Sequence, residues 1–372
     1  MGHALSEGRA GPEGDGYLMI KSINIRNFRC FEHLTIPDCR RINVIVGDSG
    51  TGKTALLEAI FLALASSPEV AARLRQVRGN EGMFNATGRA IEEALWGGLF
   101  YRWDTRRTVS IALEGTGPEA RSVSIGRGAA TTVLPLSAEL EPIESFESNG
   151  PISFNWRDSS GRFHPSIPLI GVPGASPIQF AAPSEDLPDF YLFSATQPYM
   201  AAENAGRFSL LSRAGLAAEF VQEFITEYDW VEGLSIEVVA GSPAIFASVK
   251  GLKEKIPLND ISGATTKIVG ITVAMAISTK GIVLVDEIEN GVYYKHLESM
   301  WSTIIRFARR FDCQIVTSTH SKECLDALVR AADGEVDDVM LWRIERSESG
   351  HTVSQFHGDT LKAGLEFGQE VR

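Results

Sequence analysis

The sequence predicts an α/β fold: a mostly parallel sheet with helices on both faces, an antiparallel β part at the N-terminal side, and an inserted β-rich and helical lobe. Residues 42–64 read as an apolar strand, a glycine-rich loop and a helix in direct succession. Helices and strands then alternate towards the C-terminus, with strand patterns at 281–287, 313–319 and 338–345, which is typical of a parallel sheet. Two alternating stretches within 17–37 predict a β-hairpin ahead of the first helix.

The chain divides into four predicted parts. Residues 1–17 are rich in glycine and lack the apolar core of a signal peptide, which predicts a disordered tail. Residues 18–79 and 205–372 are expected to form the two halves of one domain, called the head below. They flank the predicted inserted lobe at 80–204, where short helical patterns give way to alternating strand patterns and loop-rich stretches.

The lobe is expected to be β-rich with long loops. A helix is predicted at 90–100, and alternating patterns predict strands at 107–115 and 120–126. The Pro-, Gly- and Ser-rich stretch 148–177 is expected to hold no regular element. The sequence has no repeats and no sustained heptads, so a coiled-coil arm is not expected.

Composition and charge limit the class of protein. With 372 residues and 44% hydrophobic content, the chain can bury one large core or two moderate ones. The net charge of −12 means that any nucleic-acid contact must come from a local basic patch. No apolar stretch reaches the roughly 18 to 20 residues that span a bilayer. The four cysteines show no metal-binding spacing, so we expect reduced thiols in a cytoplasmic protein.

Residues 47–54 match the pattern GxxxxGK[ST], which cradles the phosphates of a nucleotide. Because this loop follows a strand and opens a helix, its backbone N–H groups converge on phosphate oxygens. Lys53 adds a positive charge, and the hydroxyl of Thr54 can ligate Mg²⁺. An ordinary glycine turn is the alternative. The predicted phosphate-binding residues are Gly47, Asp48, Ser49, Gly50, Thr51, Gly52, Lys53 and Thr54.

Hydrolysis of a bound nucleotide also needs a second metal anchor and a group that activates water. Asp286 and Glu287 follow the apolar run 282–285, at the carboxyl end of a strand where ligands bind in open α/β sheets. We expect Asp286 to hold the metal, directly or through water, and Glu287 to contact the attacking water. A solvated strand end is the alternative for this pair.

His320 ends the next predicted strand, 313–319. If that strand lies beside the strand of Asp286, the imidazole can reach the γ-phosphate and sense hydrolysis. A structural histidine is the alternative. The order of glycine loop, Asp-Glu strand and His strand is similar to the ATP-binding-cassette (ABC) ATPases. Within them the chain resembles the RecF-like and OLD-like branch, kin to the heads of structural-maintenance-of-chromosomes (SMC) proteins, over about 18–66 and 255–325.

The resemblance implies that each ATP is sandwiched between two chains. A signature segment of the second chain completes the site, and Ser262 and Gly263 stand at the matching position here. Ser262 is also a natural N-cap, so an ordinary capped helix is the alternative. The resemblance further implies cofactors ATP and Mg²⁺ and an Arg29 that faces the nucleotide. Gln76 and Gln197 match the family's glutamine loop only by residue type.

Two departures from the family pattern put the rate in doubt. Ala264 replaces the usual second glycine of the signature, and Ser49 stands where many relatives carry Asn. We therefore expect a slow ATPase. The resemblance implies a homodimer or higher oligomer that forms through the ATP sandwich. The roughly 50 residues after His320 suffice for one helix, one strand and a tail, so a nuclease of the topoisomerase-primase type is not expected there.

The function expected from these features is a nucleotide-gated dimeric switch in anti-phage defence or DNA metabolism, with a separate effector such as a nuclease. An energy-coupling ATPase of a transporter and a weakly hydrolysing scaffold are the alternatives. Nucleic-acid binding is possible, because arginines lie beside Tyr101 and Trp103, although solvated charges would give the same pattern. Arg102, Arg106 and Arg107 lie beside these aromatics in the sequence, and Arg73, Arg75 and Arg78 form a separate basic cluster.

Overall fold

The computed structural model describes most of the head and parts of the predicted lobe. The described residues are 19–78, 89–115, 121–128, 150–157, 163–166, 169–170, 178–179, 190–195, 201–332, 336–348 and 350–366. The predicted N-terminal tail and Gln197 lie outside them, and the side chain of Gln76 is not described either.

The central sheet has six strands in the order β10-β14-β15-β3-β16-β17. Their bounds are Phe190–Phe193 (β10), Ile282–Val285 (β14), Gln314–Ser318 (β15), Ile42–Val46 (β3), Val339–Ser347 (β16) and Gly350–His357 (β17). The first five run parallel, and β17 is antiparallel to β16. The register sets Val285 beside Thr317 and Thr317 beside Val44, so the carboxyl ends of β14, β15 and β3 meet at one edge. The predicted parallel sheet is confirmed.

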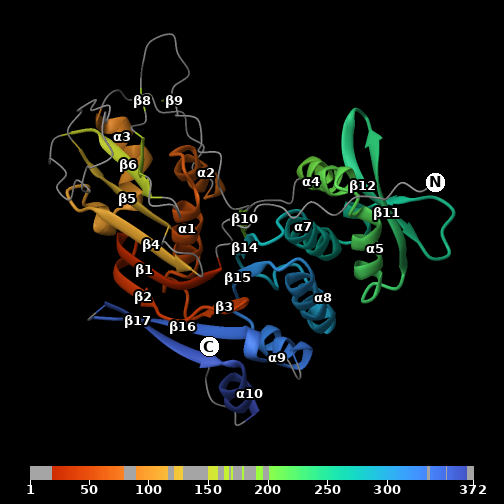
Figure 1. Cartoon of the computed structure of the whole chain (residues 1–372). Coiled ribbons are helices and arrows are strands. Elements are labelled where there is room, and N and C mark those ends of the chain that lie inside the picture. The colour runs from red at the N-terminus through yellow and green to blue at the C-terminus, as the bar shows by residue number, and fades with distance from the viewer. Residues whose placement is uncertain are drawn as a thin grey trace, which may run out of the picture.

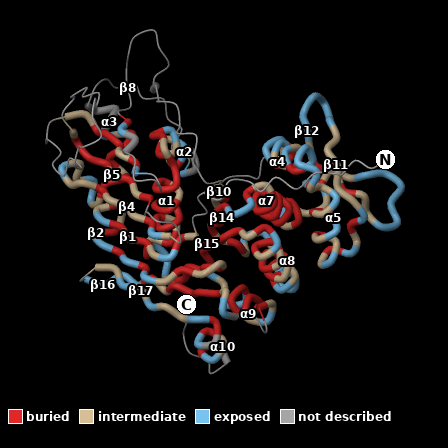
Figure 2. The backbone as a smooth tube through the Cα atoms, viewed as in Figure 1, coloured by how far each residue is buried: buried red, intermediate tan, exposed pale blue. Residues whose placement is uncertain are grey.

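Helices cover both faces of the central sheet, as predicted (Figure 1). Neighbouring strand residues point to opposite faces, and Val44 and Ile45 accordingly belong to different cores. On the face of Val44 pack α7 (Gly263–Ile277), α8 (Leu297–Arg310) and α9 (Lys322–Ala331). On the face of Ile45 packs α1 (Lys53–Leu64). Figure 2 shows α1 and α7 buried on nearly all sides.

A second, antiparallel sheet lies on the other side of α1, which contacts both sheets. Its order is β2-β1-β4-β5-β6-β7. The bounds are Phe31–Ile36 (β2), Ile20–Phe28 (β1), Val109–Gly115 (β4), Arg121–Arg127 (β5), Ile152–Arg157 (β6) and Phe163–Ser166 (β7). The predicted N-terminal hairpin is confirmed, and strands β4 to β7 of the lobe extend its sheet.

Strand β6 shows that the expectation of no regular element in 148–177 is wrong. Ile152, Phe154 and Trp156 alternate along it and are buried in the core beside α1. The indole N–H of Trp156 donates to the carbonyl of Leu62 at 3.0 Å. Burial of this apolar triad outweighs the flanking turn signals. The same stretch also contains β7 and β8 (Leu169–Ile170), and β9 (Ile178–Gln179) pairs with β8 just beyond it.

The remaining elements lie on the flanks. Helices α2 (Glu69–Val77) and α3 (Arg89–Trp96) precede the short 3₁₀ turns η1 (Gly97–Leu99) and η2 (Tyr101–Trp103). A flanking unit consists of α4 (Ala201–Arg213), α5 (Ala217–Ile225), β11 (Val231–Val239), β12 (Ser242–Val249), β13 (Ile256–Pro257) and α6 (Leu258–Ile261). Strand β10 joins the central sheet although it falls within 80–204, and the four-part division stays a prediction.

The C-terminal part is richer than one helix, one strand and a tail. After His320 come α9, β16, β17 and a last helix, α10 (Gly358–Glu366). Two further 3₁₀ turns are η3 (Tyr294–His296) and η4 (Val336–Asp338). Among the described helices, none has the length and apolar character that crossing a membrane requires.

Candidate functional site

The glycine loop after β3 has a backbone that only glycine adopts readily. Gly47, Gly50 and Gly52 have φ angles of 139°, 80° and 102°. A Cβ on Gly52 would lie 2.6 Å from the sulfur of Cys30 and from the ring of Phe31. A Cβ on Gly47 would lie 2.2 Å from the carbonyl oxygen of Ile344. The loop is therefore fixed both by its dihedral angles and by close neighbours.

Lys53 is the first residue of α1 and is almost fully buried, with 6% of its surface exposed. Its ammonium donates to the carbonyls of Gly47 at 2.7 Å and Asp48 at 2.9 Å. An ammonium has three donors, so one is left for a phosphate oxygen. Burial lowers the pKa of Lys53, while Asp286 and Glu287 act in the opposite direction. Removal of this cation would leave the loop with no equivalent charge.

The Thr54 hydroxyl donates to Oδ2 of Asp286 at 2.9 Å. Two adjacent ligands of an octahedral Mg²⁺ at 2.0–2.1 Å are about 2.9 Å apart, so this pair of oxygens fits the metal. Among the described residues, no cluster of three or more His, Cys, Asp or Glu could hold a metal by itself. A cation here would therefore take its remaining ligands from phosphate oxygens. There it would neutralise charge during phosphoryl transfer.

Ser318, the last residue of β15, contacts both Asp286 and Glu287, which follow the neighbouring strand β14. Its hydroxyl donates to Oδ1 of Asp286 at 2.6 Å and accepts from the backbone N–H of Glu287 at 2.8 Å. Asp286 is 7% exposed. Oδ1 of Asp286 thus accepts a hydrogen bond from Ser318, and Oδ2 accepts one from Thr54.

Glu287 has a φ of 48°, a left-handed conformation that is uncommon for residues other than glycine. Both sides of the residue are held: Ser318 binds its N–H, and the ammonium of Lys267 donates to its carbonyl at 2.7 Å. The carboxylate itself remains 41% exposed. Such backbone strain at a functional residue persists only where neighbours enforce it.

Lys267 is buried, with 4% exposure, on the helix that begins at Gly263. Besides Glu287, it donates to the carbonyl of Asn290 at 3.3 Å. Burial lowers its pKa to about 8, against the opposing effect of Glu289 and Glu287. The ammonium of Lys267 thus holds the loop 287–290 that follows β14.

His320 lies directly beyond β15, which pairs with β14 as expected. Its Nε2 is 3.9 Å from Oε1 of Glu287, and its backbone N–H donates to Glu289 at 2.8 Å. The imidazole is 40% exposed. The imidazole therefore lies beside Glu287 and is accessible to a ligand.

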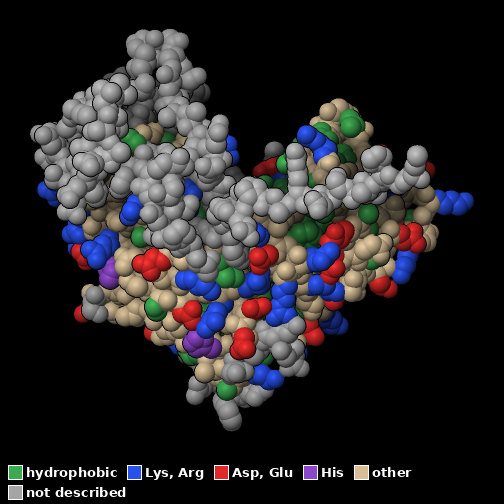
Figure 3. Space-filling view, in the orientation of Figure 1, with side chains coloured by type: hydrophobic (Ala, Val, Ile, Leu, Met, Phe, Trp, Pro, Cys, Tyr) green, Lys and Arg blue, Asp and Glu red, His purple; other side chains and the backbone are tan. Residues whose placement is uncertain are grey.

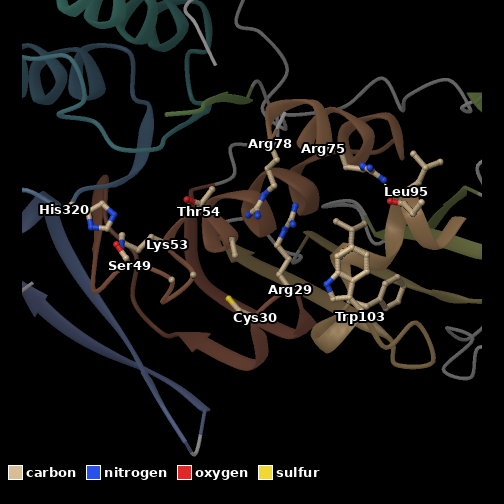
Figure 4. A pocket seen from close by; sticks show the side chains of 17 residues that line it. Arg29, Cys30, Ser49, Lys53, Thr54, Arg75, Arg78, Leu95, Trp103 and His320 are labelled. Carbon is tan, nitrogen blue, oxygen red and sulfur yellow. Dashed lines mark hydrogen bonds between the residues drawn. The ribbon is translucent and has the colours of Figure 1, made fainter. Parts of the chain in front are cut away.

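A pocket of about 620 Å³ extends from the glycine loop towards α3 (Figure 4). Of the predicted site residues, Arg29, Ser49, Gly50, Gly52, Lys53, Thr54 and His320 line it. Asp286 and Glu287 contact two of these lining residues, Thr54 and His320 respectively. Ser262 and Gly263 are not among the lining residues.

Arg29 lies in the pocket wall but is paired with an acid. Its Nε is 2.7 Å from Glu58, which is 1% exposed and also receives two hydrogen bonds from Arg78. Burial lowers the pKa of the Arg29 guanidinium, and Glu58 partly offsets this. One buried carboxylate thus anchors two arginines beside the glycine loop, which leaves a net positive wall.

The signature segment forms the start of α7. The Ser262 side chain accepts from the N–H of Thr265 at 3.4 Å, as an N-cap does. A Cβ placed on Gly263 would meet nothing within 4 Å, so the helix N-terminus is open to a ligand.

Sequence reasoning missed the roles that Ser318, Glu58 and Lys267 have in this site. Ser318 stands two residues before His320, so a hydroxyl at a strand end was an available signal. Glu58 is an acid within an otherwise apolar helix, which also pointed to a buried partner. The contacts of Lys267 join residues 20 and 23 positions apart and gave no local signal.

Comparison with known proteins agrees with this geometry. Residues 22–93 match a family model described as an AAA domain. The "ATP/GTP phosphatase" of Helicobacter pylori is 21% identical across 94% of this chain and 98% of its own length. The DNA replication and repair protein RecF of Bacillus mycoides is 37% identical over 73 residues, which is 20% of that protein. This second match is therefore local.

A similar fold occurs in the SMC head domain with an extended coiled coil, bound to the C-terminal domain of ScpA, from Pyrococcus furiosus. The TM-score is 0.50 at 12% identity, and the match covers 94% of this chain and 99% of that one. At this identity the match shows the shared fold.

Proposed function

We propose that this chain, an ABC-type ATPase of the RecF/SMC-like kind, is a nucleotide-gated switch in which two copies close on two ATP molecules. One observation carries the proposal. Lys53, Thr54 and His320 line one pocket, and Asp286 contacts Thr54 at its edge. Ser262 and Gly263, in contrast, lie at an open helix end outside the wall of this pocket. A second chain can bring that helix end to the pocket.

The start of α7 has the chemistry of a phosphate contact. The first N–H groups of a helix lack intrahelical acceptors, and the helix dipole favours an anion there. Ser262 satisfies one of these groups, that of Thr265. The backbone at Gly263 and Ala264 remains for oxygens of a nucleotide bound to the partner.

Within one chain, each group has a distinct proposed role. Lys53 and the loop N–H groups hold the β- and γ-phosphates, and Thr54 with Asp286 would hold Mg²⁺. Glu287 orients and deprotonates the attacking water, and His320 senses the γ-phosphate. Arg29 is proposed to face the same phosphates.

The surface offers limited support for nucleic-acid binding. Most of the arginines considered for it contact acids: Arg73 contacts Glu69, Arg78 contacts Glu58, and Arg106 contacts Asp104. Figure 3 shows basic and acidic side chains interspersed over the visible described surface. We therefore propose that the output passes through a protein effector such as a nuclease, in anti-phage defence or DNA metabolism in the cytoplasm. The predicted lobe at 80–204 would provide the specificity.

Closure on ATP is tested by the mass of the complex. With a non-hydrolysable ATP analogue and Mg²⁺, the 40.5 kDa chain is expected to double in mass. Ser262→Asp should stay monomeric, because aspartate caps helices as well as serine but repels a phosphate. Ser262→Asn, which is neutral and also a good cap, is the matched control and should still double. An unchanged mass of the wild-type chain with the analogue would contradict the switch.

A further inference from the structure

The segment Gly97–Trp103 forms a short shelf beside the phosphate loop. It is tied to the hairpin of β1 and β2, because the N–H of Arg29 donates to the carbonyl of Leu99 at 2.9 Å and Phe28 pairs with Phe100. Leu99 and Phe100 are buried. The shelf is therefore held in place with the same hairpin that packs on the glycine loop.

Trp103 lies on this shelf with its indole against two glycines. A Cβ on Gly97 would be 3.0 Å from Cε3 of the indole, and one on Gly98 would be 3.5 Å from Cη2 and Cζ2. Because neither position carries a side chain, the ring can lie against the backbone. One side of the indole is thus supported by protein.

The remaining indole surface is accessible to solvent. Trp103 is 69% exposed, the highest exposure of any described tryptophan. It is held there at an energetic cost, since Arg102 and Trp103 have φ angles of 54° and 61°. Two consecutive left-handed residues other than glycine are rare. The indole is therefore fixed in an exposed position by strained backbone and by the glycine shelf.

Trp103 also lines the pocket that contains Lys53 and Thr54 (Figure 4). The end of the pocket towards α3 differs from the phosphate end in chemistry. Apolar residues of α3 and of the shelf line it. Arg75, which donates to the carbonyl of Ala94, and Arg29 beside Trp103 add positive charge. The residues of this end are Arg75, Ala94, Leu95, Gly98, Leu99, Phe100 and Trp103.

We propose that the indole of Trp103 is the stacking platform for the base of the bound nucleotide. This inference rests on the proposed nucleotide site and adds the part that recognises the base. The phosphate loop grips one end of the ligand, and the flat, supported indole meets the planar ring at the other. Base stacking on an aromatic side chain is favourable and tolerates different bases, since every base has a π-face.

The platform also predicts the substrate class. Discrimination between adenine and guanine requires donors and acceptors aimed at the base edge. Besides an indole face and aliphatic groups, the described lining offers the guanidiniums of Arg29, Arg75 and Arg78. Each of these is already engaged by Glu58 or by the carbonyl of Ala94. Adenine and guanine nucleotides are therefore expected to bind alike. A cytosine nucleotide should bind more weakly, because its single ring stacks over less area.

Calorimetric titration with ADP, GDP, CDP and pyrophosphate tests the platform, because none of the four carries a γ-phosphate to be hydrolysed. For Trp103→Ala, the Kd for ADP and GDP is expected to rise about ten-fold. The Kd for pyrophosphate should not change, since this ligand has no base. Trp103→Phe keeps an aromatic face and should stay within about three-fold of the wild-type Kd for ADP. Tyr101→Ala is the matched control, because Tyr101 is an aromatic neighbour outside the pocket wall.

Unchanged ADP affinity in Trp103→Ala would overturn the proposal, including the case in which that variant loses binding of single-stranded DNA instead. Equal losses for ADP and pyrophosphate would also overturn it, because they would show a general effect on the loop. If the wild-type chain binds neither ADP nor pyrophosphate, the nucleotide site itself is refuted, and the platform with it. Binding of pyrophosphate without any gain from a base would refute the platform alone.

Discussion

Lys53→Ala is expected to weaken ATP binding by about 100-fold, because a hydrogen bond to a charged group contributes about 1.5–3 kcal/mol and a buried cation is lost as well. Among the described residues that line the pocket, Lys53 is the one lysine. Thermal unfolding with and without ATP measures this loss. A ligand at 100 times its Kd stabilises the folded protein by about 2.7 kcal/mol, and the variant should show little of that shift.

Lys250→Ala is the control for Lys53→Ala, since Lys250 is exposed and pairs with Asp229 on the surface. It should keep the full stabilisation by ATP. The unfolding temperature without nucleotide shows whether the loop tolerates the loss of Lys53, whose ammonium bridges Gly47 and Asp48. Tight ATP binding by a folded Lys53→Ala protein would refute the phosphate-cradle assignment.

Glu287→Gln is expected to reduce the ATPase rate by roughly 10²- to 10⁴-fold, the usual contribution of a general base. Glutamine has nearly the same size, and the contacts with Ser318 and Lys267 involve the backbone of residue 287. The variant should therefore keep its fold and its affinity for ATP. Since closure persists until hydrolysis, dimers should accumulate on ATP and Mg²⁺.

Phosphate release and complex mass measured in parallel check the Glu287→Gln prediction. Glu298→Gln is the matched control, because Glu298 is an exposed acid on α8 paired with Arg330. It should hydrolyse ATP at the wild-type rate. A Glu287→Gln protein with unchanged turnover would show that another group activates the water. An enzyme whose wild-type turnover is negligible would favour the weakly hydrolysing scaffold.

Much of the head could be predicted because its signals are local. The glycine loop needs positive φ angles at Gly50 and Gly52, and these are visible as residue types. The contact of Thr54 with Asp286 joins residues 232 positions apart. It was still predictable, since the carboxyl ends of parallel strands meet at one edge of the sheet.

Other features depend on tertiary contacts that leave no local pattern. The expectation for 148–177 failed because its Pro, Gly and Ser signals hid the alternation of Ile152, Phe154 and Trp156, which becomes decisive only when α1 supplies a surface to bury them. The pairing of Arg29 with Glu58 likewise requires the hairpin to fold over α1. Trp103 was recognised as an aromatic beside arginines, but its place in the pocket depends on Gly97 and Gly98, against which its indole packs.

Mixing two inactive variants tests most directly whether the ATP site is shared between chains. Lys53→Ala and Ser262→Asp should each lack ATPase activity as pure proteins. In a mixed pair, the intact loop of the Ser262→Asp chain faces the intact Ser262 of the Lys53→Ala chain. Neither variant is expected to pair with itself on ATP, so the pairs that form are mixed and each keeps one of two sites. The mixture should therefore recover up to about half of the wild-type rate. A mixture as inactive as its components would contradict the shared site.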